Sequence, residues 1–196
     1  MNRAFLTAAA AAAVLLLPLA GCSLGGKAPP ELLTLTAASR QATAQPRTAG
    51  QGNVITVTVP TAPHALANNR IAVYAGPTTI QYLKDGVWAD KPGELFRLLL
   101  SETLAGRSGW VVVDPSVYTQ VQGVVLSGQL LQFGYDPARG EAVVLFEASL
   151  ARPQKAVTTN RFEARVPAAA ADGATVAAAL NQAANQVAAE IADWVG

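Results

Sequence analysis

The sequence predicts a layered α/β domain with a mixed sheet, carried behind a signal-like N-terminus. Three observations support this. Short β-branched or alternating stretches between Val54 and Val166 indicate strands. A leucine-rich helical pattern interrupts them, and a long alanine-rich helical pattern ends the chain. Strands, a helix, further strands and a long helix, in that order, fit helices packed on a sheet.

The first 22 residues resemble the signal of a bacterial lipoprotein. Arg3 precedes an apolar run from Ala4 to Ala20, which is typical of a secretory signal peptide. The sequence Leu19-Ala-Gly-Cys22, which contains the only cysteine, resembles a lipobox. In that motif the peptide is cut before the cysteine, and the cysteine sulfur and amine receive acyl chains such as palmitate. We therefore expect a signal peptide over residues 1–21 and lipidation of Cys22.

Two other interpretations fit this segment less well. A plain signal peptide would leave a free thiol in an oxidising compartment. A transmembrane anchor needs about 20 apolar residues, whereas this run is shorter and contains Pro18. Two or three acyl chains would give lasting membrane attachment. Ser23, by the enteric sorting rule, permits export to the outer membrane, so we expect the protein in the cell envelope, on the periplasmic face of that membrane.

Charge and composition narrow the possible partners. The formal net charge is +1 and the signal contributes only Arg3, so the mature side chains sum to zero. A neutral body has no electrostatic footprint for nucleic acid and no polybasic patch for anionic lipid. Residues 22–52 are rich in Gly, Pro, Ala and Thr and predict a lipidated, flexible tether. Within it, Leu32 to Thr36 alternates like a short strand that could add to a sheet edge. The folded domain is expected over residues 53–196.

The predicted strands are bounded by proline, glycine or aspartate signals. They cover Val54–Val59, Arg70–Tyr74, Thr79–Leu83, Trp110–Val113, Gly123–Phe133, Ala142–Leu150 and Thr158–Val166. Residues 60–69 and 134–140 are predicted loops, and Asp85-Gly86 is a predicted turn. Ala142–Leu150 is apolar on both faces, so we expect it to be central and covered on both sides. Thr158–Val166 alternates apolar and charged residues, as an edge strand does.

Two helices are predicted. Pro92 and Glu94 suit the first turn of a helix that ends near Ala105, and Gly106 suits its C-terminal cap. Asp172 can cap a longer helix that runs to about Val195. The apolar stripe of that helix comprises Val176, Leu180, Ala184, Val187, Ile191 and Trp194. Its polar residues, expected to lie away from the stripe, are Asn181, Gln182, Asn185, Gln186 and Glu190.

No motif predicts catalysis, a cofactor or a metal site. His64 is the only histidine and follows Pro63 in a predicted loop. Without a second histidine or a mature free thiol, no zinc-type cluster can form. The glycine pairs lack the Lys-Ser/Thr that completes a phosphate-binding loop. Tyr82 and Trp88 flank the Lys84-Asp85-Gly86 turn, where they are candidate partner-binding residues. The alternative is that both rings belong to the core.

The order of several features resembles the ABC-type transport auxiliary lipoprotein family, which includes the lipoprotein of the Pqi intermembrane lipid-transport system. These features are a loop leucine, an arginine-led strand, a Tyr-Leu segment, a Trp-Ala pair opening a helix, and a last helix ending near a tryptophan. Here they are Leu66, Arg70, Tyr82-Leu83, Trp88-Ala89 and Trp194. The resemblance implies a three-layer α/β/α sandwich.

The resemblance also implies a role and partners. Such lipoproteins accompany a mammalian-cell-entry (MCE) domain protein, a permease and an ATPase that move phospholipids or other hydrophobic molecules between membranes. The lipoprotein would bind the MCE-domain protein and no nucleotide. Three alternatives remain open at this stage: a direct periplasmic lipid carrier, a structural envelope-assembly lipoprotein similar in fold to the N-terminal domain of the Tol-system propeller protein, and, last, a hydrolase.

Overall fold

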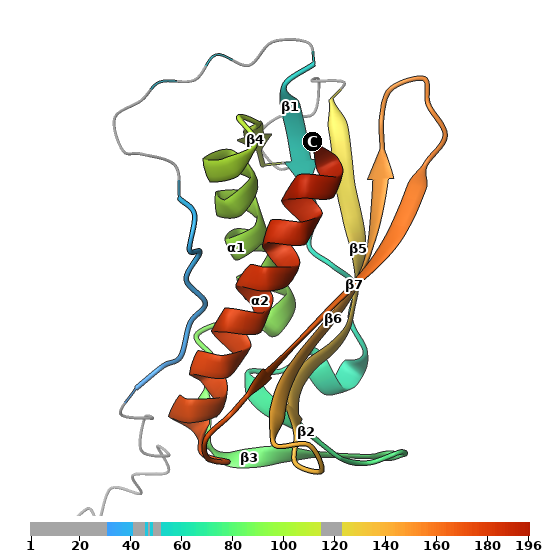
Figure 1. The fold of residues 1–196 in the computed structure, drawn as a ribbon. Helices are drawn as coiled ribbons and strands as arrows, with labels where there is room; N and C mark the ends of the chain where they lie inside the picture. The colour runs from blue at the N-terminus through green and yellow to red at the C-terminus, as the bar shows by residue number, and fades with distance from the viewer. Residues whose placement is uncertain (1–30, 41–45, 47, 49–51, 115–122) are drawn as a thin grey trace, which may run out of the picture. The chain divides into compact units, whose positions relative to one another are not determined.

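The computed structural model describes residues 31–40, 46, 48, 52–114 and 123–196. The signal peptide, Cys22, Ser23 and most of the predicted tether lie outside these residues. The strands are β1 (Val54–Val57), β2 (Arg70–Gly76), β3 (Thr79–Val87), β4 (Val111–Val113), β5 (Val124–Asp136), β6 (Glu141–Ala151) and β7 (Thr158–Pro167). The helices are the 3-10 turn η1 (His64–Leu66), α1 (Pro92–Arg107) and α2 (Gly173–Val195) (Figure 1).

A long central strand, β5, organises the sheet. Antiparallel β6 pairs with it along nearly its whole length, and β7 pairs with β6 in turn. On its other side β5 has two parallel neighbours at different heights, β1 at residues 124–126 and β2 at residues 134–135. β4 then pairs parallel with β1, and β3 pairs antiparallel with β2. The sheet is therefore mixed, as predicted.

Two strands continue three or more residues beyond their predicted limits. β5 continues through Gly134 to Asp136, which the sequence analysis placed in a loop. β3 continues through Asp85-Gly86, a predicted turn, to Val87. Gly86 has φ +84°, a left-handed conformation that glycine adopts without steric cost, and the β2–β3 register shifts in this stretch. The Asp-Gly pair therefore forms an irregularity inside the strand instead of ending it.

Both α-helices lie on one face of the sheet. α2 contacts β6, β7 and α1, while α1 contacts β1 and β4. The even-numbered residues of β6 from 142 to 150 face the helices and are buried. On the other face of β6, Val143 is buried but Leu145, Glu147 and Ser149 are half-exposed. β6 is central, as predicted, but the expectation that it is covered on both sides holds only at Val143.

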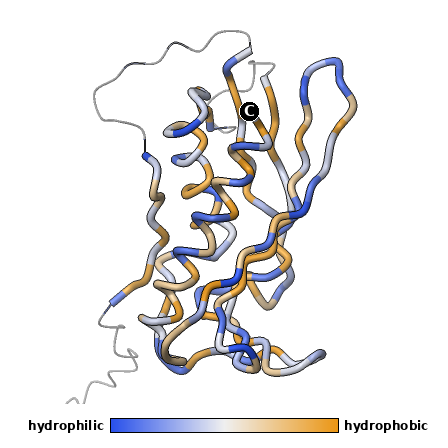
Figure 2. Tube along the Cα trace, viewed as in Figure 1, coloured by the Kyte–Doolittle hydropathy of each residue, from blue (hydrophilic) through white to orange (hydrophobic). Residues whose placement is uncertain are grey.

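The α/β class, the mixed sheet and the long C-terminal helix are confirmed. A second helical layer, which a three-layer sandwich requires, is not part of the described structure. β7 is an edge strand, as its alternating charges predicted: Phe162, Ala164 and Val166 are buried while Arg161 and Glu163 are exposed. The tube coloured by hydropathy shows this alternation of hydrophobic and hydrophilic residues along the strands (Figure 2).

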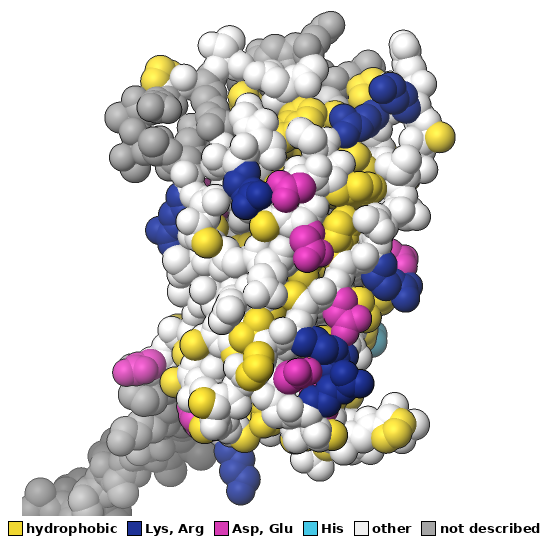
Figure 3. Space-filling view, viewed as in Figure 1, with side chains coloured by type: hydrophobic (Ala, Val, Ile, Leu, Met, Phe, Trp, Pro, Cys, Tyr) yellow, Lys and Arg dark blue, Asp and Glu magenta, His cyan; other side chains and the backbone are white. Residues whose placement is uncertain are grey.

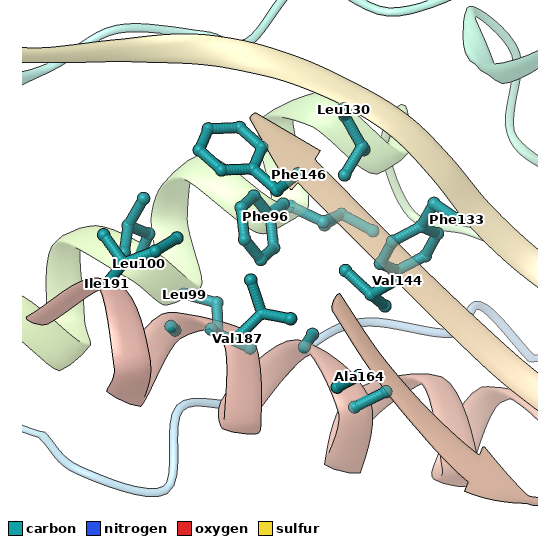
Figure 4. Close-up of a cluster of buried hydrophobic side chains, with 14 of the residues drawn as sticks. Phe96, Leu99, Leu100, Leu130, Phe133, Val144, Phe146, Ala164, Val187 and Ile191 are labelled. Atoms are coloured by element: carbon teal, nitrogen blue, oxygen red, sulfur yellow. The ribbon is translucent and has the colours of Figure 1, made fainter. Parts of the chain in front are cut away.

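The core fills the space between the helices and the sheet. Phe96 of α1 and Phe146 of β6 meet with ring centroids 5.1 Å apart. Val187 and Ile191 of α2, both fully buried, pack from the helical side (Figure 4). Leu180 of the same helix is also fully buried in this core. The predicted stripe of α2 is thus buried except for Trp194, which is half-exposed and meets Phe162 edge-on at 5.7 Å.

Candidate functional site

Trp88, a predicted partner-binding residue, lies in the core. Its side chain is 0% exposed, and its ring meets Phe133 edge-on with centroids 5.7 Å apart. Its backbone is held on both sides, because Trp88 N donates to Asn69 O and Asn69 Nδ2 donates to Trp88 O. A partner cannot reach this ring without disrupting the fold. The prediction that Trp88 is a contact residue is therefore wrong, and the core alternative holds for it.

Tyr82, the other candidate, is half-exposed and carries a defined polar environment. Its hydroxyl donates to Ala65 O and accepts from Asn68 Nδ2, both at 3.1 Å. The Arg70 guanidinium lies 4.6 Å from the ring centroid, a distance typical of a cation–π contact. Arg70 itself is exposed at the start of β2. Arg70 on β2 and Tyr82 on β3 therefore place a cation next to an aromatic ring on the β2–β3 hairpin.

The Lys84-Asp85-Gly86 segment between Tyr82 and Trp88 has a structural role. The carboxylate of Asp85 accepts a hydrogen bond from Gly173 N, the first residue of α2, at 3.0 Å. The first N–H groups of a helix have no partner within the helix, so Asp85 satisfies one of them from outside. The structure therefore separates the two predicted contact residues: Tyr82 is half-exposed, and Trp88 is buried in the core against Phe133.

Sequence reasoning missed that residues 31–40, here called the N-terminal strap, lie against the domain along their length. Leu33 forms a parallel β-bridge with Trp88: Leu33 N donates to Val87 O at 2.8 Å, and Ala89 N donates to Leu33 O at 2.7 Å. Leu33 and Leu35 pack against the core, and Ala37 is buried. The alternation at Leu32 to Thr36 correctly indicated a strand-like addition to a sheet edge.

Two asparagines of α2 hold the strap further along. Asn181 Oδ1 accepts from Thr36 N at 2.7 Å, and Asn185 Oδ1 accepts from Ala38 N at 2.7 Å. Asn185 Nδ2 also donates to Thr36 O at 2.9 Å. Asn185 thus binds both backbone polar groups that flank residue 37, as a neighbouring strand would. Both residues lie away from the apolar stripe, as predicted, but the sequence analysis assigned them no partner. Their spacing of four residues on one helix face was the signal that could have revealed them.

The far face of the sheet carries charge pairs. Arg161 of β7 bonds Glu147 of β6 at 2.6 Å. Arg165 bonds Glu163 at 2.6 Å and also lies 3.4 Å from Asp136. On the face shown in Figure 3, basic and acidic side chains are likewise intermixed, with hydrophobic side chains between them. On the face shown in Figure 3, the basic side chains therefore do not form a separate positive patch that would attract a polyanion.

The remaining properties of the described residues concern metal sites, membrane-spanning helices and shifted pKa values. Within the described residues, no three or more His, Cys, Asp or Glu side chains gather where they could bind a metal ion. No helix of that part of the chain has the length and apolarity needed to cross a membrane. Burial raises the pKa of the Tyr74 hydroxyl, and the hydrogen bond from Phe133 N at 2.9 Å opposes this effect. Tyr74 therefore anchors β2 to β5 as a neutral phenol.

Comparison with known proteins gives one family and several similar folds. The sequence model of the family described as "ABC-type transport auxiliary lipoprotein component" matches residues 33–192. A crystal structure of a Xanthomonas campestris protein assigned to the family DUF330 has a TM-score of 0.68 and 21% identity, covering 84% of this chain and 94% of its own. A crystal structure of an uncharacterized protein has a TM-score of 0.66 and 18% identity, covering 85% of this chain and 100% of its own. No curated protein matches the chain in sequence.

Proposed function

Because the chain belongs to the ABC-type transport auxiliary lipoprotein family, we propose that it is the lipid-anchored auxiliary component of an MCE-type transporter. The family's description associates it with an ABC transporter and, as a lipoprotein, with the cell envelope. We further propose that the protein lies on the periplasmic face of the outer membrane and binds the MCE-domain protein. The auxiliary role rests on the family match over residues 33–192, which includes the strap, the sheet and both helices.

The packed interior favours an adaptor over a lipid carrier. A carrier of this architecture would hold an acyl chain between the sheet and the helices. In this structure that space is filled by side chains, including Phe96, Phe146 and Leu130 (Figure 4). Opening it would leave a cavity in a close-packed core, which is costly. We therefore propose that the body binds a protein partner and carries out no catalysis of its own.

The proposed anchor is Cys22, and labelling tests it directly. An alkynyl fatty acid fed to cells should label the wild-type chain. It should not label Cys22→Ser, which lacks the acceptor thiol. Equal labelling of both proteins would exclude Cys22 as the acylated residue. Separation of the inner and outer membranes then locates the labelled protein, and recovery with the inner membrane would contradict the outer-membrane assignment based on Ser23.

The proposed contact surface is the Tyr82–Arg70 pair on the β2–β3 hairpin. Tyr82 is half-exposed, and tyrosine and arginine are residue types that contribute strongly to interfaces. Arg70→Ala should therefore weaken co-purification with the MCE-domain protein encoded beside the lipoprotein gene, while the melting temperature stays within a few degrees. Lys155→Ala, in the exposed turn between β6 and β7 at the opposite end of the sheet, is the control. Failure of the intact lipoprotein to bind any MCE-domain protein encoded in its own operon would overturn the functional proposal.

A further inference from the structure

We propose that α1 and α2 form a binding site for the chain's own N-terminal strap, and that release of the strap lengthens and repositions the membrane tether. This inference rests on the proposed lipid anchor at Cys22. The side-chain amides of Asn181 and Asn185 bind backbone groups of the strap. The ligand of this site is an extended segment that turns alternate small or aliphatic side chains, Leu33, Leu35 and Ala37, toward the core.

Each helix has a feature that accommodates the strap. On α2, Asn185 Nδ2 also donates to Asn181 O at 2.8 Å, which fixes the amide that meets the strap. On α1, a Cβ at Gly106 would lie 3.0 Å from backbone atoms of Ser39 and Arg40. At the other end of the strap, a Cβ at Gly86 would lie 3.0 Å from Leu33 Cδ1. The absence of side chains at these two glycines therefore allows the strap to approach the domain closely.

The same contacts indicate a segment that can leave. Ala37 is the only residue of the strap with a buried side chain, and Leu32 is 57% exposed. The hydrogen bonds to Asn181 and Asn185 lie at the surface, and a single β-bridge, made by the two backbone bonds of Leu33, joins the strap to β3. Few buried apolar contacts and exposed backbone hydrogen bonds are the features of segments that open locally while the rest of a domain stays folded. The core elements, in contrast, are held by fully buried stripes.

Release would change the reach of the tether. When the strap is bound, Glu31, where the domain begins, is nine residue steps from Cys22. When the strap is free, the domain begins near Asn53, which is 31 residue steps from Cys22. A fully extended chain covers at most about 3.6 Å per residue, so the maximum span rises from about 30 Å to about 110 Å.

Release would also change which end of the domain the tether holds. The strap begins beside Gly86, at the N-terminal end of α2, and runs along the helix toward its C-terminal end (Figure 1). β1 begins beside β4 at the other end, where Trp110 Nε1 donates to Gly196 O at 2.7 Å. With a rise of about 1.5 Å per residue, α2 places these attachment points roughly 35 Å apart. The bound and released strap would therefore present different ends of the domain to the membrane.

Amide hydrogen exchange of the full-length lipidated protein tests strap binding. In wild type, the amides of Thr36 and Ala38 should be protected, because they donate to Asn181 and Asn185. The variant Asn181→Ala/Asn185→Ala should raise their exchange by about tenfold or more, with core amides unchanged. Gln182→Ala/Gln186→Ala is the matched control, because both residues are exposed on the same helix. Wild-type exchange rates in the asparagine variant, or equal increases in the control, would overturn the proposal.

Neutron reflectometry tests the change in reach. The same proteins would be held by their lipid in a supported bilayer of phosphatidylethanolamine and phosphatidylglycerol. The asparagine variant is combined here with Leu33→Pro, which cannot donate to Val87 O, because the backbone bonds of Leu33 would otherwise still hold the start of the strap. This triple variant should move the protein layer outward by on the order of 10 Å, within the added chain length. A layer that stays at the wild-type distance, although strap exchange has risen, would overturn the reach inference. A protein that the bilayer does not retain would instead contradict the lipid anchor, while the exchange data still decide strap binding.

Discussion

Gly173, the first residue of α2, lies directly against Gly86 of β3. A Cβ on Gly173 would lie 2.8 Å from both Gly86 Cα and Asp85 O, closer than such atoms approach in proteins. This contact brings the start of α2 within reach of the Asp85 carboxylate. The junction therefore depends on two glycines that are 87 residues apart in sequence.

Gly173→Ala should destabilise the protein. The new methyl group meets backbone, which cannot rotate away, so the junction of α2 with β3 must shift. Such overpacking typically costs about 1–3 kcal/mol. Chemical denaturation followed by circular dichroism measures the change. Gly76→Ala is the control, because its Cβ would meet Thr79 at an ordinary 3.9 Å. Equal free energies of unfolding for wild type and Gly173→Ala would contradict the close contact.

Trp88→Ala should unfold the protein more easily before it affects any partner. The ring is fully buried against Phe133, so its removal leaves a large cavity and should cost about 3–5 kcal/mol. Tyr82→Phe removes only a hydroxyl that bonds Ala65 and Asn68, so it should cost about 0.5–1.5 kcal/mol. Urea denaturation compares the two. A Trp88→Ala variant of wild-type stability would show that this ring is not in the core.

The stripe of α2 should respond to truncation as a buried face does. Leu180→Ala and Ile191→Ala each remove a fully buried side chain and should cost about 2–5 kcal/mol. Gln182→Ala, on the exposed side of the same helix, should change the free energy of unfolding by less than about 0.5 kcal/mol. Thermal and chemical denaturation give both values. Similar costs at Gln182 and Leu180 would mean that the helix faces are misassigned.

Asp172 should make stability sensitive to acid. Its carboxylate accepts from Thr175 N and from the Thr175 hydroxyl, each at 2.8 Å. These bonds, the backbone one first, hold the pKa of Asp172 below its ordinary value. Because the folded pKa lies below the unfolded one, this contribution is complete above the unfolded pKa of about 4. It is lost as the pH falls through the folded value.

Asp172→Asn provides the comparison for this effect. Asparagine caps helices well but does not titrate. We therefore expect the difference in free energy of unfolding between wild type and Asp172→Asn to shift against wild type as the pH falls from 6 to 3. Urea denaturation at each pH measures it. Parallel pH profiles for the two proteins would contradict a lowered pKa at Asp172.

Local signals predicted the elements well because each element is encoded by its own residues. The alternation in Thr158–Val166 identified an edge strand, and the stripe of α2 identified its buried face. Asp172 was recognised as a cap from its position alone, and its side chain does accept from Thr175 N. The strand limits at Asp85-Gly86 and Gly134 were wrong, because a glycine can serve a turn or an irregular strand equally well. Gly106 was also wrong as a helix cap, because α1 continues to Arg107 and is capped by Ser108. The first strand ends at Val57, two residues before the predicted limit.

By itself the sequence determined the α/β class, the order of elements, the family resemblance and the expected lipid site at Cys22. These follow from periodicity and short motifs, which act over a few neighbouring residues. The tertiary structure alone decided that Trp88 is core while Tyr82 stays at the surface, since both follow the same local pattern. It also decided that Asn181 and Asn185 hold the strap. A polar helix face looks the same in sequence whether it meets water or a distant backbone, because the partner of each amide lies more than 140 residues away.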